Sequence, residues 1–372
     1  MKRYGWIALV LMAAMPMSAA SKLTVAQLRE TLVTLEQAQK DDADVASKLM
    51  TVELTEQLTR DARKGLAQYL PGPLSRDQAD ILEGRSAFLA PPATELPTAA
   101  APDAAAQKAI LAKAADYASK TYMQNPHLTA TKVTSRFQDE TVNTSSTPGL
   151  VVAATNSFQR KSEARTEPVE IDHGIEKPSA SQAKTKWGEN HEISEGDPGL
   201  NLGAVVQEAE AGGKIEWLRW ETIDGKQAAV FSFAVDKKKA HYAVSYCCFP
   251  STDTQSGIAA SGTFAPIPGE IQSVTTWRPF KKVVGYHGEL YIDPESGTVV
   301  RVVARADLKP TEYVHQEMVR IDYGPILAGV KQYEAPIASY VVNEVVPGGD
   351  SGTGAIYSVR HTLLIAEYIS YR

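Results

Sequence analysis

The chain contains very little cysteine. Of its 372 residues only two are cysteines, and they are neighbours, Cys247 and Cys248. Adjacent Cα atoms lie about 3.8 Å apart, closer than the roughly 4.4–6.8 Å that is usual for a disulfide. Their spacing also excludes a Cys-X-X-Cys redox motif and a cysteine zinc site. We expect two buried or half-buried thiols. A strained bridge between them, which would make them a redox pair, and an intermolecular bridge are the alternatives.

Long apolar runs are scarce as well. The run from Trp6 to Met15 follows the basic residues Lys2 and Arg3 and precedes the small residues Ser18 to Ala20. This order predicts a secretory signal peptide over residues 1–20, cleaved near Ala20. The run is short for a membrane span and no second one follows. We therefore expect a periplasmic or extracellular mature chain without an integral membrane span.

Positive charge is not in excess. Without Lys2 and Arg3, the 38 basic side chains become 36, against 44 acidic ones, a net charge of −8. The basic runs Lys237–Lys239 and Lys281–Lys282 are short, and no aromatic residues interleave with them. Nucleic acid is therefore not an expected partner.

One stretch matches an enzyme motif. Gly349-Asp350-Ser351-Gly352 is the tetrapeptide around the nucleophile of trypsin-like serine proteases. A serine needs a histidine that accepts its proton and a carboxylate that orients the histidine. No histidine has the sequence setting of those proteases, and only twenty-one residues follow Ser351; the histidines are His127, His173, His191, His241, His287, His315 and His361. The glycines of this stretch predict a turn between two strands.

Other catalytic signatures are missing. The histidines do not have the short spacings of a metal site, and no phosphate loop or dinucleotide fingerprint occurs. Glu289 and Asp293 share one strand face with Tyr291, which is typical of a solvated outer face. We predict no catalytic residue, no metal site and no cofactor.

The chain divides by its periodicity. Residues 21–89 have apolar residues at helical spacing, including a segment after Asp41 that carries Leu49, Val52, Leu54 and Leu58. A Pro/Ala connector over 90–102 and a helix over 103–125 follow. Residues 126–372 alternate as β-strands do, interrupted by a polar loop over 176–199 and a helix over 200–211. Asp224-Gly225 and Asp293–Gly297 predict hairpin turns.

Aromatic side chains recur on the predicted strands. Alternation places Trp217 and Trp220 on opposite sides of one strand. Consecutive hairpins would set one face of each of three successive strands side by side. The resulting candidate binding face for an apolar ligand consists of Trp217, Trp220, Phe231, Phe233, Tyr242 and Tyr246. The alternative is that these side chains are simply the core.

The stretch from Tyr286 to Arg301 resembles the strand-turn-strand unit of bacterial lipoprotein-carrier and envelope-sensor proteins. The N-terminal helical region, Phe88–Pro92, the Trp217 hairpin and Ile321–Pro325 together resemble a group of exported bacterial proteins. The carrier resemblance is firmest over residues 283–345. It implies a curved antiparallel sheet, like an unclosed barrel, covered by helices, and a binding role for apolar chains.

We therefore predict an α+β protein, with an N-terminal helical region followed by a large curved antiparallel β-sheet covered by helices. The expected function is that of an exported, non-enzymatic envelope protein that binds a lipid or lipoprotein within the sheet. The alternative is a protein-interaction or structural module of the envelope that takes no small ligand. Its partner would be an envelope protein bound through the N-terminal helices.

Overall fold

The computed structural model describes residues 21–141, 156–177, 194–195, 200–212, 214–251, 276–309, 312–345 and 360–372. The expected signal peptide, the turn at Gly349–Gly352 and most of the loop over 176–199 lie outside these residues. The side chains of Cys247 and Cys248 lie outside them too, so the expected thiol state stays a prediction.

The N-terminal region is a small helical unit with its own core. Its elements are β1 (Ser21–Leu23), α1 (Val25–Gln37), α2 (Asp42–Met50), β2 (Val52–Leu54), α3 (Arg60–Leu66) and α4 (Pro73–Ser86). The side chains of Thr24, Asp41 and Thr59 cap the first three helices by accepting a backbone N–H in the first turn. The expected helical path through Val52 and Leu54 is wrong. Both side chains are buried and Glu53 between them is exposed, the period of a strand, and β2 pairs in parallel with β1.

The connector leads to two further helices. A short 3₁₀ turn, Ala93–Glu95, lies within it, and α5 (Ala104–Asp116) begins at the N-cap Asp103. A π-helical turn over Tyr117–Thr121 and a 3₁₀ turn over Tyr122–Gln124 continue α5. The other helix, α7 (Leu202–Gly212), buries the apolar face that the sequence predicts.

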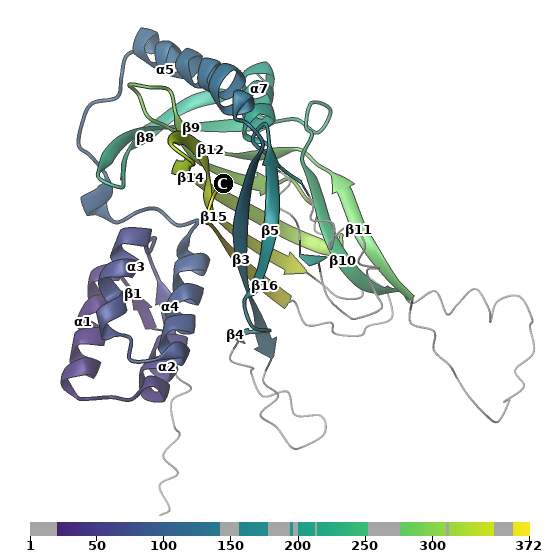
Figure 1. The fold of residues 1–372 in the computed structure, drawn as a ribbon. Coiled ribbons are helices and arrows are strands. Elements are labelled where there is room, and N and C mark those ends of the chain that lie inside the picture. Colours follow the sequence, from purple (N-terminus) through teal and green to yellow (C-terminus); the bar gives the residue numbers. More distant parts are fainter. Residues whose placement is uncertain are drawn as a thin grey trace, which may run out of the picture.

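The main body is an eleven-stranded sheet in which every pairing is antiparallel. From edge to edge its strands are β6 (Ile175–Lys177), β5 (Arg165–Asp172), β3 (Leu128–Thr141), β16 (Arg360–Ile369), β15 (Lys331–Val345), β14 (Val314–Ala328), β13 (Val299–Ala306), β12 (Tyr286–Ile292), β9 (Lys226–Val235) and β8 (Ile215–Ile223), and β4 (Asn156–Arg160) pairs with β3 beside this path. The sheet does not close into a barrel, which confirms the predicted α+β class (Figure 1). No helix in the described ranges is both long enough and apolar enough to cross a bilayer.

Both predicted hairpin turns form. Asp224 and Gly225 adopt positive φ angles of 48° and 75° between β8 and β9, the conformation that two-residue hairpins require. Between β12 and β13 the Asp293 carboxylate accepts the N–H groups of Glu295 and Ser296, and Gly297 has a φ of 78°.

The strand after β9 does not form the third hairpin expected from the sequence. β10 (Ala243–Ser251) instead pairs with β11 (Thr276–Val283) and β7 (Ser194–Glu195) in a separate three-stranded sheet. The edge of β9 is taken by β12, over the register from Tyr286↔Val235 to Ile292↔Ala229. β12 supplies Leu290 and Ile292 to the same core as β9, so burial outweighs nearness in sequence.

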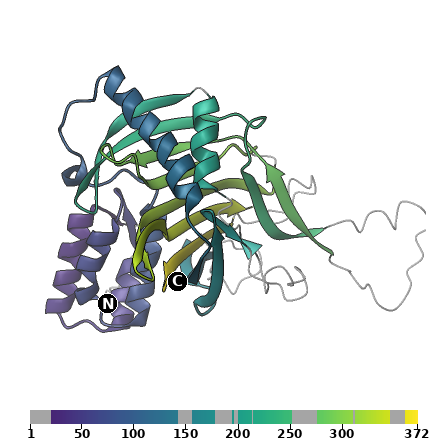
Figure 2. The ribbon, with the colours of Figure 1, turned by 45° about the horizontal axis from the view of Figure 1, so that its top comes forward.

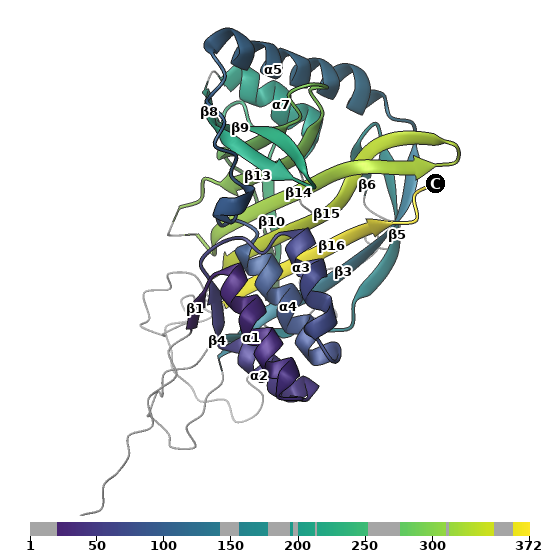
Figure 3. The same ribbon diagram turned by 90° about the vertical axis from the view of Figure 1, so that its left-hand side faces the viewer.

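Helices cover the two faces of the large sheet. We call the face under α5 and α7 the inner face, and the face that carries α1–α4 the outer face. Figure 2 shows α5 and α7 lying side by side across the strands, and Figure 3 shows the N-terminal helices against β15, β16 and β3 on the opposite side. The main core lies between the inner face and its two helices, while Ile81 of α4 packs on Phe137 and Leu363 of the outer face.

Candidate functional site

The six predicted aromatic residues meet at the inner face. Phe231 and Phe233 on β9, Tyr242 just before β10, and Tyr246 on β10 are each at most 3% exposed and belong to the main core. Trp217 and Trp220 on β8 are partly buried against the same core. Although β10 belongs to another sheet, the side chains of Tyr242 and Tyr246 join the expected core.

The prediction that Trp217 and Trp220 point to opposite sides is wrong. The β8–β9 register shifts between Trp217 and Arg219, which leaves Leu218 as an extra residue. Such a bulge resets the alternation of side chains. The two indole rings therefore stack edge to face with centroids 4.8 Å apart, and Trp217 makes a second edge contact with Phe231 at 5.4 Å.

The inner aromatic side chains pack on one another. The Tyr286 ring lies 5.7 Å from that of Phe233 and 5.4 Å from that of Tyr242, and its hydroxyl donates to Glu208 of α7. With α5 and α7 in place, these side chains form a closed core. Access to them depends on how firmly the two helices are held.

Helix α5 is anchored mainly at its C-terminal end. Within the helix itself Ile110 and Ala114 are buried, and Leu111 and Ala115 are partly buried against the same core. Just beyond it Tyr122 is 1% exposed, contacts Tyr323 edge to face at 5.6 Å and donates its hydroxyl to the Gly174 carbonyl. The π-helical turn between α5 and Tyr122 is a feature often found at functional sites.

Two exposed contacts hold the rest of α5 and the connector that precedes it. The Lys113 ammonium donates to the carbonyls of Pro294 and Glu295 in the β12–β13 turn, at 3.0 Å each. The Trp220 indole donates to the Ala100 carbonyl of the connector at 2.9 Å. Because these bonds are exposed, each contributes little to the free energy that keeps α5 closed.

A polar row crosses the inner face beside the apolar core. Glu317 on β14 pairs with Asn343 on β15, Asn343 pairs with Thr362 on β16, and Thr362 pairs with Gln138 on β3. Directly paired residues share one face of a sheet. The next row on that face, Val319, Val341 and Leu364, belongs to the main core.

Several atoms of this polar row are buried without a hydrogen-bond partner. They are Oε2 of Glu317, Nδ2 and Oδ1 of Asn343, and Oγ1 of Thr362. These three side chains are at most 3% exposed. A buried polar atom without a partner costs about 1–3 kcal/mol, and such atoms are few in native proteins. Three adjacent side chains of this kind mark the row as a candidate polar binding element.

The carboxyl group of Glu317 has an altered acidity. Its burial raises the pKa to about 7, although the hydrogen bond that it accepts from the Tyr242 hydroxyl favours the charged form. Near neutral pH this carboxyl can therefore either donate or accept a hydrogen bond.

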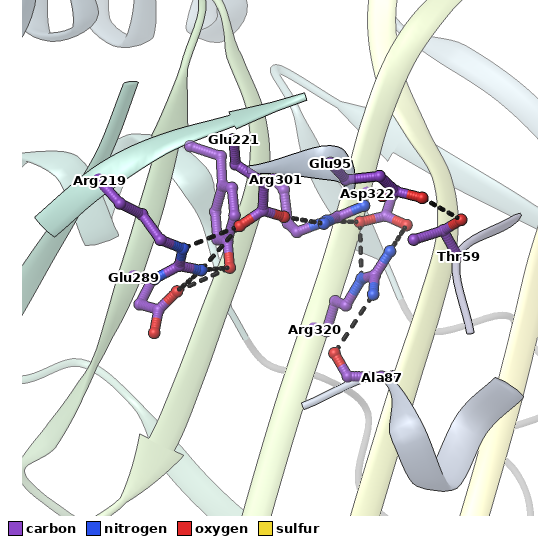
Figure 4. A network of polar contacts seen from close by, with 10 residues as sticks. Thr59, Ala87, Glu95, Arg219, Glu221, Glu289, Arg301, Arg320 and Asp322 are labelled. Carbon is purple, nitrogen blue, oxygen red and sulfur yellow. Dashed lines mark hydrogen bonds and ion pairs between the residues drawn. The ribbon is translucent and has the colours of Figure 1, made fainter. Parts of the chain in front are cut away.

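The outer face carries a second group of buried charges (Figure 4). The Asp322 carboxylate accepts from Arg301 at 2.6 Å and from Arg320 at 2.7 Å. Burial alone would raise the pKa of Asp322, but the two guanidinium groups lower it. Arg219 forms a parallel set of bonds to Glu221, Glu289 and the Tyr291 hydroxyl.

This network joins the helical region to the sheet. Arg320 donates to the Ala87 carbonyl and Arg305 to the Phe88 carbonyl, just after α4, and Tyr340 donates to Glu83 of α4 at 2.6 Å. The strand carboxylates Glu221, Glu289 and Asp322 are engaged by guanidinium groups, so they are poorly placed for proton transfer. We interpret the network as a structural joint.

The expectation of a solvated outer face around Glu289 and Tyr291 is wrong. Tyr291 is only 5% exposed, because the segment that follows α4 covers this part of the sheet. Sequence reasoning also missed Arg301, Arg320 and Asp322. Alternating charges on a strand ordinarily indicate solvent, and nothing in the pattern signals the helical unit above them.

A groove of about 710 Å³ lies next to this joint, between the helical region and the tips of the β8–β9 and β12–β13 hairpins. Its floor is formed by Glu221, Arg301 and Asp322, which already pair with one another. The charged groups of this floor therefore form the ion pairs of the structural joint.

The helical region buries most of the large apolar side chains of residues 24–60. The apolar residues at helical spacing form its internal core, with Leu28, Leu32 and Leu49 each 1% exposed. Among residues 24–60, all of which the structure describes, Met50 is the large apolar side chain that is exposed.

Within the described ranges no three His, Cys, Asp or Glu side chains are arranged to share a metal ion. Comparison of the chain with protein-family models, curated proteins and solved structures gave no significant match.

Proposed function

We propose that the protein is an exported, non-enzymatic binding protein that holds an apolar chain against the inner face of its sheet, beneath α5. The observation that carries the proposal is the aromatic cluster around Trp217, Trp220 and Phe231, under a helix with two fully buried and two partly buried apolar side chains of its own. The predicted signal peptide and the resemblance of residues 283–345 to carrier proteins support the same function.

The free energy gained by burying an apolar ligand is large enough to offset the cost of moving α5. Fully burying one large aliphatic side chain contributes about 1.5–3 kcal/mol, and an alanine contributes less. Lifting α5 takes Ile110 and Ala114 out of the core, together with the partly buried Leu111 and Ala115, and should therefore cost about 3–6 kcal/mol. An acyl chain of about ten buried methylenes would gain roughly 8 kcal/mol at about 0.8 kcal/mol each. Ligand burial can offset the opening.

The direction of opening follows from the anchors. Tyr117 and Tyr122 hold the C-terminal end of the helix in the core, and the Pro/Ala connector precedes its N-terminal end. The helix would swing about the π-helical turn and expose Trp217 and Trp220. The apolar chain would then occupy the position that Ile110 and Ala114 leave.

Native mass spectrometry tests whether there is a ligand. The chain of residues 21–372 would be purified without detergent from its natural compartment. We expect a co-purifying mass that extracts into organic solvent. A protein free of any such mass, which also fails to bind added lauric acid esters, would overturn the proposal and favour the protein-interaction module.

Variants on β8 test the location. We expect Trp217→Ala to weaken binding of the apolar dye 1-N-phenylnaphthylamine about tenfold, because one wall of the aromatic cluster is lost. Leu218→Ala is the matched control, since Leu218 is adjacent in sequence but 44% exposed. Equal affinities of the two variants would place the dye elsewhere.

A further inference from the structure

The polar row of the inner face suggests which class of apolar ligand is bound. This inference rests on the function proposed above and deepens it. Glu317, Asn343 and Thr362 lie in one cross-strand row, directly beside the apolar row Val319, Val341 and Leu364. A ligand chain that crosses the apolar row in the direction of the strands would bring its end group to the polar one.

The unpaired atoms define the chemistry of that end group. Asn343 offers its amide NH₂ group as a donor and its amide oxygen as an acceptor, and Thr362 offers its hydroxyl. Glu317 offers carboxyl oxygen Oε2, while its other oxygen, Oε1, accepts a hydrogen bond from Tyr242. These carboxyl, amide and hydroxyl groups of the protein match ligand hydroxyls, because a hydroxyl both donates and accepts hydrogen bonds. The row contributes no cationic side chain of its own, which disfavours a phosphate or carboxylate head group.

We propose that the row formed by Glu317, Asn343 and Thr362 binds the uncharged, hydroxyl-bearing head group of a single-chain amphiphile. The apolar tail crosses the row of Val319, Val341 and Leu364, which belongs to the same core as the aromatic cluster. A purely structural row would be expected to pair its own groups, as the charges of the outer face do. Here three neighbouring side chains, at most 3% exposed, leave four atoms unpaired.

Two matched probes separate head group from tail. Monolauroylglycerol has two free hydroxyls, and methyl laurate has the same acyl chain and none. Their affinities would be measured by displacement of 1-N-phenylnaphthylamine from the chain of residues 21–372. We expect wild type to prefer monolauroylglycerol by at least about tenfold, since a site built to bind hydroxyls rejects an analogue that lacks them.

Apolar replacements in the row complete the test. Thr362→Val and Asn343→Leu keep the approximate volume and remove unpaired polar atoms, so the thermal stability of the unliganded protein should not fall. Each should weaken monolauroylglycerol binding by about tenfold and leave methyl laurate binding unchanged. Ser339→Ala, on the same face of β15 and away from the row, is the control.

The outcomes are distinct. Equal binding of the two probes by wild type, or unchanged monolauroylglycerol binding in both variants, would overturn the head-group site while the proposed apolar binding stands. Failure of wild type to bind either probe would overturn the proposed function and the head-group site together. If Asn343→Leu does not fold, Thr362→Val, which is nearly isosteric, decides the question alone.

Discussion

Replacing Glu317 by glutamine tests the burial of the polar row through its effect on stability. The side chain is 3% exposed, and burial raises the pKa of its carboxyl from 4.5 to about 7. The folded protein therefore keeps a proton that the unfolded chain releases at lower pH. Glutamine has nearly the same shape and no such titration.

The magnitude follows from the two pKa values. A shift from 4.5 to about 7 is roughly 2.5 units, and each unit corresponds to about 1.36 kcal/mol, giving about 3 kcal/mol. Between pH 4.5 and 7 the folded state binds more protons than the unfolded state, so the contribution of Glu317 to stability falls as the pH rises. It is fully present below pH 4.5 and lost above about pH 7.

Urea unfolding of wild type and Glu317→Gln at intervals from pH 4 to 8.5 measures this contribution, because the titration of other groups is common to both proteins. The free energy of unfolding of wild type, minus that of the variant, should fall by about 3 kcal/mol over the interval and then level off. Tyr242→Phe removes the hydrogen bond that lowers the pKa, so it should extend the fall to higher pH. A difference that stays constant with pH would refute the reasoning.

Three further substitutions test the framework around the site. Asp322→Asn should lower the free energy of unfolding by about 3 kcal/mol or more, since Arg301 and Arg320 lose their shared counter-charge; a loss below 1 kcal/mol in urea unfolding would show that the joint is dispensable. Asp42→Ala should cost about 1 kcal/mol by the same assay, because the Asp42 carboxylate caps α4 by accepting the N–H groups of Leu74 and Ser75 at 2.9 Å; an unchanged midpoint would contradict this role. Gly288→Ala should abolish soluble, folded protein as judged by circular dichroism, because the added Cβ would lie 1.8 Å from the Val303 backbone oxygen; Gly324→Ala, whose Cβ would meet only the Ile337 side chain at 3.0 Å, should fold.

The sequence predicts the fold class and the local turns well because both depend on nearby residues. Asp224-Gly225 has the residue types that favour positive φ angles, and it adopts them, and the alternation along β12 and β13 is visible in the sequence. The prediction of a third hairpin is wrong because β9 pairs with β12, a segment about fifty residues further along the chain. Adjacency in sequence carries no information on which distant strand takes the edge of β9.

The candidate site was predicted only in part, for similar reasons. Aromatic content selected Phe231, Phe233 and Tyr242 correctly as members of one cluster, but a bulge at Leu218 is not readable from alternation. Asn343 and Thr362 stand among apolar residues of two strands that the sequence joins by a predicted turn, but alternation does not fix which residues of the two strands pair. Only the register between β15 and β16 brings them together.

The most direct measurement of the central claim is the rate at which 1-N-phenylnaphthylamine enters beneath α5, measured by stopped-flow fluorescence. Gly297 has a φ of 78°, and a Cβ there would lie 2.6 Å from Lys113 Cβ, so Gly297→Ala forces α5 and the β12–β13 turn apart. Gly225→Ala has a similar φ of 75° with no atom within 4 Å, and so carries the same backbone strain without touching the helix. We predict dye binding by wild type, several-fold faster association for Gly297→Ala, and an unchanged rate for Gly225→Ala. Absence of binding by wild type, or equal rates in the two variants, would contradict an apolar site covered by α5.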